Sequence, residues 1–193
     1  MRYLFLFVLL APIFGFCQNY EYSLNTIELD VVGESKRGYQ TLFSFEEKKV
    51  RNAFWNYCKL IGKTTNQRSH YVLEVPTDDG KRIIIYGVAS AAGLYETNFS
   101  LLLEDTGVPQ ANMKKYLGQV GAFLVAFKQH VYLTHFDEEI AELEKKAERL
   151  SIKYVKEKKS APSLESPWLA EIEKINAQIE SLRSRQIEVV TRG

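Results

Sequence analysis

The sequence predicts an α+β fold: a two-layer head in which an antiparallel sheet has helices on one face, followed by a C-terminal antiparallel helical hairpin. Three observations lead to this prediction. Short segments of alternating apolar and polar residues are joined by turns that are too short for parallel crossovers. Two longer segments concentrate their apolar residues at helical spacing. The last third carries two apolar stripes spaced alternately by three and four residues, as in paired helices.

Residues 1–17 read as a secretory signal peptide. Arg2 precedes an unbroken apolar run from Tyr3 to Leu10, which is shorter than the ~20 residues of a membrane span. We expect cleavage before Gln18 and an exported, periplasmic or extracellular protein. A lipid anchor on Cys17 is the alternative, although the bulky Phe16 before it fits the lipoprotein pattern poorly.

Charge and cysteine content exclude several classes of protein. The 193 residues include 25 Lys and Arg against 24 Asp and Glu, so no general basic field favours nucleic acid or an anionic membrane. Without residues 1–17, Cys58 is the remaining cysteine, which excludes an internal disulfide and a cysteine-built zinc site. Cys58 falls on the apolar face of a helix, so we expect a buried, unreactive thiol.

The predicted head spans residues 20–132 and begins with strands. Residues 26–32 alternate apolar and polar side chains, which predicts a strand with one wet face. Residues 33–38 are expected to form a charged turn before a short strand over 39–43. A helix follows over 44–62, with Ser44 and Glu47 as a capping box, and 63–69 is expected to be a polar loop.

Three more strands are predicted over 70–75, 83–86 and 95–103, with turns at 77–80 and 90–93. Residues 83–86 are apolar on both faces, which indicates a central strand. The short turns require antiparallel pairing.

A helix opens at Pro109 and is apolar almost all round, with Gly118 and Gly121 permitting close packing. Lysines bracket its apolar stretch too closely for a membrane span. The step from Val131 to Leu133 shifts the apolar stripe around the axis. Either the helix 109–159 is continuous and the stripe faces a new partner, or it breaks near Thr134. The lack of Gly and Pro between Gly121 and Pro162 favours continuity.

Residues 133–190 form the predicted hairpin, a coiled-coil-like tail with a Pro- and Ser-rich turn between its two stripes. Tyr154, Leu164 and Trp168 fall near its tip. One interpretation is that they contact a partner, because Trp and Tyr dominate interface energetics. The alternative is that Trp168 only closes the end of the hairpin.

The sequence offers no catalytic residues, cofactor-binding residues or metal ligands. It contains no glycine-rich phosphate loop, no Gly-x-Ser-x-Gly and no Cys-x-x-Cys. His130 and His135 are five residues apart, which places them on different sides of a helix.

The layout resembles a loose group of exported Gram-negative bacterial proteins with a signal peptide, a small α+β head and a charged coiled-coil tail. The matching segments are Ser44–Gly62, Tyr71–Leu103 and Phe136–Val189. The resemblance implies a small sheet with helices on one side and transfers no catalytic residue.

We therefore expect a non-enzymatic structural or protein-interaction module that pairs through its tail with a protein partner or a second copy. The alternative is a small-ligand or cell-wall-binding module that uses the exposed sheet face or a groove beside Gly118–Gly121. A hydrolase has no positive support in the sequence.

Overall fold

The computed structural model describes residues 23–77, 80–160 and 166–192. The predicted signal peptide with Cys17, the turn residues Asp78 and Asp79, and Leu164 lie outside these ranges. The described chain has an α+β fold with a six-stranded antiparallel sheet and three helices, so the predicted class is confirmed.

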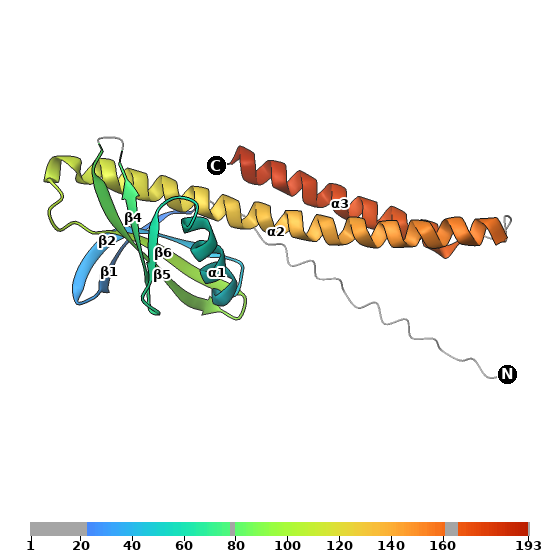
Figure 1. Cartoon of the computed structure of the whole chain (residues 1–193), viewed down its shortest axis with the longest axis horizontal. Helices are drawn as coiled ribbons and strands as arrows, with labels where there is room; N and C mark the ends of the chain where they lie inside the picture. Colours follow the sequence, from blue (N-terminus) through green and yellow to red (C-terminus); the bar gives the residue numbers. More distant parts are fainter. Residues whose placement is uncertain (1–22, 78–79, 161–165, 193) are drawn as a thin grey trace.

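Figure 1 shows a strongly twisted sheet crossed by one long helix. The strand order is β1-β2-β6-β5-β4-β3, and all pairs are antiparallel. The strands are β1 (Asn25–Val31), β2 (Glu34–Phe43), β3 (Lys63–Asn66), β4 (Tyr71–Pro76), β5 (Arg82–Gly93) and β6 (Glu96–Leu103). The predicted central strand lies within β5, which pairs with β4 on one side and β6 on the other.

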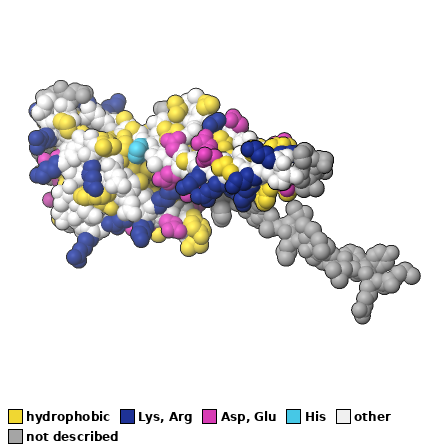
Figure 2. Space-filling view, turned by 45° about the vertical axis from the view of Figure 1, so that its right-hand side comes forward, with side chains coloured by type: hydrophobic (Ala, Val, Ile, Leu, Met, Phe, Trp, Pro, Cys, Tyr) yellow, Lys and Arg dark blue, Asp and Glu magenta, His cyan; other side chains and the backbone are white. Residues whose placement is uncertain are grey.

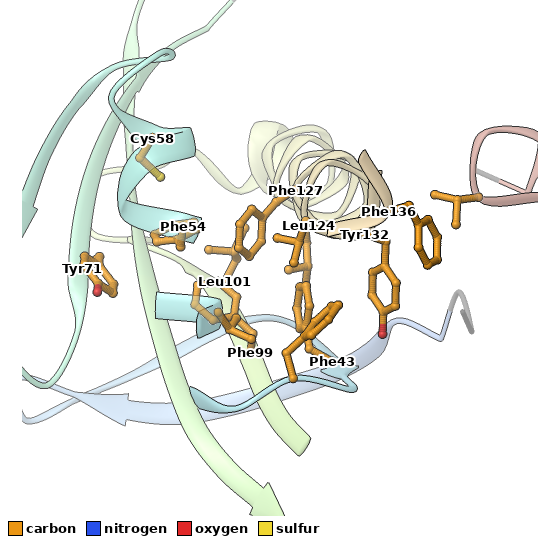
Figure 3. Packing of buried hydrophobic residues seen from close by; sticks show 14 of the residues in the cluster. Phe43, Phe54, Cys58, Tyr71, Phe99, Leu101, Leu124, Phe127, Tyr132 and Phe136 are labelled. Atoms are coloured by element: carbon orange, nitrogen blue, oxygen red, sulfur yellow. The ribbon is translucent and has the colours of Figure 1, made fainter. Parts of the chain in front are cut away.

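The helices are α1 (Glu47–Cys58), α2 (Gln110–Ser160) and α3 (Pro167–Thr191). α1 and α2 pack on the same face of the sheet, where Phe54 of α1 and Phe127 of α2 meet Phe99 of β6 (Figure 3). The ring centroids of Phe54 and Phe127 lie 4.7 and 5.2 Å from that of Phe99. This aromatic centre fixes both helices on the sheet, because large rings bury the most apolar area.

α2 is a single helix of 51 residues. The continuous alternative is therefore correct, and the expected boundary between residues 132 and 133 falls inside the helix. Val120, Leu124 and Phe127 face the sheet, whereas Ile140 and Leu150 are buried further along. The shift of the apolar stripe thus marks the change of packing partner from the sheet to α3.

Four local predictions were wrong. The charged segment 34–38 belongs to β2, and the turn before it is made by Val32 and Gly33, whose φ angles are 58° and 80°. Residues 63–66 form the edge strand β3 rather than a loop, since an edge strand can be polar. Residues 90–93 extend β5 through an irregularity after Ala91 instead of turning.

The fourth correction concerns the start of α1. The residue that precedes the helix is Glu46, and no side chain caps it, so Ser44 and Glu47 form no capping box. The backbone N–H of Ser44 instead donates to the hydroxyl of Tyr132 on α2, at 3.1 Å. A tertiary hydrogen bond has taken the place of the expected local one.

An added Cβ would have different surroundings at Gly38, Gly121 and Gly118. A Cβ on Gly38 would lie 1.9 Å from the carbonyl oxygen of Leu101, so β2 and β6 approach closely only because residue 38 is glycine. On α2, a Cβ on Gly121 would meet the Tyr39 ring at 3.2 Å, whereas a Cβ on Gly118 would meet none of the described residues within 4 Å. The close packing expected at both α2 glycines is therefore present at Gly121 and absent at Gly118.

Candidate functional site

The far half of α2 extends beyond the sheet together with α3 (Figure 1). α3 runs back along α2, and Ile175, Ile179, Leu182 and Val189 bury their side chains in the seam. Ion pairs join the two helices across its edges: Lys146 with Glu171 at 2.8 Å and Glu144 with Arg183 at 3.1 Å. We call this part, residues 139–160 with 166–192, the projecting helix pair.

The predicted contact residues Tyr154 and Trp168 both lie near the far end of the projecting helix pair and are half-buried. The structure places the Nζ of Lys153 5.0 Å from the centroid of the Trp168 ring, a cation–π contact. Leu169, next to Trp168, is 45% exposed. One part of Trp168 thus packs on α2 while an apolar surface remains open beside it.

Polar contacts hold this end of the pair in place. The hydroxyl of Ser166 donates to the carboxylate of Glu157, which ties the start of α3 to the last turns of α2. Further back, the hydrogen bond from Lys146 lowers the pKa of Glu171. These exposed pairs fix the register of α3 more than they stabilise it, because exposed ion pairs contribute little free energy.

A groove between α1 and α2 is the second candidate. It has a volume of about 440 Å³, and Ala53 and Val131 contribute apolar lining. Asn52 and Asn56 line it from α1, one helical turn apart. Its remaining lining residues are polar or charged and come from both helices: Glu46, Lys48, Lys49, His130, Thr134, His135 and Glu138.

His135 links the two sides of this groove. The Nζ of Lys49 lies 3.0 Å from Nδ1 of His135, and Nε2 of His135 lies 3.4 Å from Glu139. Burial, and then the charge of Lys49, lower the pKa of His135. The imidazole is therefore held neutral and accepts a hydrogen bond from the Lys49 ammonium.

No pattern in the sequence predicted that these groove residues lie close together. Their signal is an i, i+4 pair of amides on α1 and an i, i+4, i+8 row of His130, Thr134 and Glu138 on α2. Such rows are typical of any solvated helix face, so the groove becomes visible only once the two helices are placed. Within the described residues, no three His, Cys, Asp or Glu side chains are grouped closely enough to hold a metal ion.

A buried charge cluster lies on the sheet face opposite the helices. Lys36 of β2 is 1% exposed and pairs with Glu34 and with Glu104, whose Oε1 lies 2.6 Å from Nζ. The hydroxyl of Tyr86 donates to the other oxygen of Glu104 at 2.9 Å. This sheet face is therefore only partly exposed to solvent. The Leu102 side chain points to it, because Leu101 and Leu103 point to the helices, and Leu102 is fully buried.

The pKa values in the cluster follow from its contacts. Burial alone would raise the pKa of Glu104, but hydrogen bonds from Lys36, Thr106 and Tyr86 outweigh it and hold the value at about 2. Burial alone would lower the pKa of Lys36, but hydrogen bonds to Glu104 and Glu34 raise it. All the charges are mutually satisfied, so the cluster is built for stability rather than for proton transfer.

Cys58 is buried on α1, as its place on the apolar stripe predicts. Burial raises the pKa of its thiol to about 12, against a smaller opposite effect of the Thr64 hydroxyl. A thiol with this pKa is protonated at neutral pH and is a poor nucleophile.

No helix in the described ranges combines the length and the apolar character that a membrane crossing requires. Comparisons with protein-family models, with curated proteins and with solved structures find no match to this chain.

Proposed function

We propose that this protein is an exported, non-enzymatic interaction protein of the cell envelope. Its two-layer head supports a helical hairpin, and the far end of that hairpin contacts a protein partner or a second copy of the chain. Tyr154, Trp168 and the adjacent Leu169 are the proposed contact residues. Leu164 belongs to the same proposal and lies outside the described residues.

The length of α2 is the observation that carries this proposal. Its 51 residues span ~77 Å at ~1.5 Å per residue. The groove that α2 forms with α1 ends at Glu138, and beyond it the ion pairs that join α2 to another element go to α3. The far part of the pair continues the hydrophobic core of the head through Ile140, Leu150 and Ile175, and it carries exposed surface beyond the sheet, which favours a role in contact.

A photo-crosslinking residue placed at position 169 in the native envelope tests the proposal. We expect adducts from position 169 and none from position 94, because Leu94 is equally apolar and more exposed but lies on the head. Trp168→Ser should remove the adducts while the circular dichroism spectrum stays helical. The mass of the adduct separates a second copy from a different protein. Equal adducts from both positions, or none from position 169, would contradict the proposal.

The groove between α1 and α2 supports a second candidate, a module that binds a small hydroxyl-rich ligand such as a cell-wall saccharide. The groove lies further along α2 than Gly118–Gly121. Asn52 and Asn56 offer amides, and Ala53 offers an apolar contact. Thermal shifts with saccharide fragments test it: a stabilisation that Asn52→Ala removes would support binding, and uniform absence of shifts would count against it.

A further inference from the structure

The outward face of α2 carries a cationic stripe along the projecting helix pair. Its members are spaced 4-3-4-3 and are all exposed: Lys145, Arg149, Ile152, Lys156 and Lys159. At ~100° per residue, this spacing keeps the five side chains within an arc of about 80°. Leu150 lies on the opposite side of the helix, in the seam with α3, so the stripe faces away from the rest of the molecule.

The four cations of the stripe are not neutralised within the described part of the chain, where no ion pair involves them. Neighbouring charges behave differently: Lys146 is paired with Glu171, and Arg183 with Glu144 and Glu180. Two exposed acidic residues, Glu142 and Glu148, lie at the two edges of the stripe, three residues before and after Lys145. Figure 2 shows Lys and Arg side chains gathered on the extended part of the molecule.

Aliphatic side chains lie within this basic surface. Ile152, at the middle of the stripe, is 52% exposed, and Val155, one turn further and beside it, is 49% exposed. Lysine and arginine side chains can extend sideways while their apolar stems lie along a hydrophobic boundary. Cations therefore surround a small exposed apolar centre, and an anionic surface with an apolar interior can contact both.

We propose that this stripe docks the projecting helix pair on an anionic lipid surface. The inference goes beyond the protein contact proposed above, because it uses the outward face of α2 rather than Trp168 and Leu169. The stripe runs ~21 Å along a straight helix, so a flat partner meets all five side chains at once. A polyanion chain would use the cations alone, whereas a bilayer also receives Ile152 and Val155.

The expected affinity follows from the number of cations. Each Lys or Arg near an anionic membrane surface contributes about fivefold to binding. Neutralising three of them should therefore weaken binding about a hundredfold, and the interaction should fall steeply with added salt.

Co-sedimentation of the full chain with lipid vesicles tests the proposal. The probe vesicles contain phosphatidylcholine with about 30% phosphatidylglycerol, and pure phosphatidylcholine vesicles report any contribution of the apolar residues 3–10. The test variant is Lys145→Gln/Lys156→Gln/Lys159→Gln. The matched control, Lys48→Gln/Lys81→Gln/Lys114→Gln, removes the same charge from exposed positions on the head and on the sheet-covering part of α2.

We expect the stripe variant to lose about a hundredfold in affinity for the anionic vesicles and the control to lose less than about fivefold. Ile152→Gln should weaken vesicle binding severalfold and leave binding to inorganic polyphosphate unchanged. Equal losses for the two triple variants would overturn the assignment to the stripe. Polyphosphate binding as tight as vesicle binding, together with no effect of Ile152→Gln on vesicles, would overturn the assignment to lipid. Neither result bears on crosslinking from position 169.

Discussion

Nζ of Lys36 lies 2.6 Å from Oε1 of Glu104, although the two residues are 68 positions apart in the sequence. Lys36 sits in β2, and Glu104 follows the last residue of β6. The pair therefore joins two neighbouring strands on the sheet face opposite α1 and α2, and it depends on the β2–β6 register.

The first prediction concerns the loss of this pair. Glu104→Gln should lower the free energy of unfolding by about 3 kcal/mol, because it leaves the buried ammonium of Lys36 with one charged partner. Glu34→Gln should cost less than about 1 kcal/mol, since the Glu34 side chain is mostly exposed. Urea unfolding of the two variants measures the difference. Equal losses would show that burial does not control the energetics of the cluster.

The second prediction is a loss of stability in acid. Because the pKa of Glu104 is about 2 in the fold against an ordinary 4.5, its contribution is complete above 4.5 and is lost as the pH falls toward 2. The raised pKa of Lys36 contributes stability that is complete below pH 10.5. This contribution is lost only in alkali, as the pH rises through the folded value.

Unfolding in urea at about pH 6 and about pH 3 tests this prediction. The native chain should lose more stability between the two conditions than Glu104→Gln, which has no carboxyl to protonate at that position. A parallel loss in both proteins would assign the acid sensitivity to other carboxylates.

The third prediction compares two glycines. Gly38→Ala should destabilise the fold by about 3 kcal/mol or more, because its Cβ would collide with the backbone of Leu101. Gly118→Ala should stabilise it by about 1 kcal/mol, since its Cβ meets no described residue and alanine favours a helix. Thermal melting of both variants measures the two effects. A stable Gly38→Ala protein would mean that β2 and β6 can separate without cost.

Much of the architecture can be read from local pattern. The alternation of Ile27, Leu29 and Val31 predicts β1, and the 3-4 spacing predicts which residues α3 buries. The predictions are wrong where a residue far away in the sequence determines the local structure. Gly38 lies in a charged run that is typical of a turn. It is nevertheless part of a strand, and the backbone of Leu101 leaves no room for a Cβ at this position. Ser44 has the spacing of a cap, yet Tyr132 accounts for its backbone hydrogen bond.

The candidate sites follow the same division. The position of Trp168 near the end of the helix pair follows from the spacing of one segment, so the sequence predicts it. The groove between α1 and α2 needs Asn52 and His130, which are far apart in the sequence and meet only because both helices pack on one aromatic centre. No periodicity within either segment contains that information.

The last prediction concerns the seam that carries the projecting helix pair. Ile175 is 1% exposed, whereas Ile187 of the same helix is 65% exposed. Ile175→Asp should cost several kcal/mol, because it places an unpaired carboxylate between α2 and α3, and α3 should detach and lose helical circular dichroism. Ile187→Asp makes the same chemical change on the solvent face and should leave the spectrum unchanged. If both variants keep their helical signal and melting temperature, the seam does not hold α3, and the projecting pair cannot act as a rigid contact element.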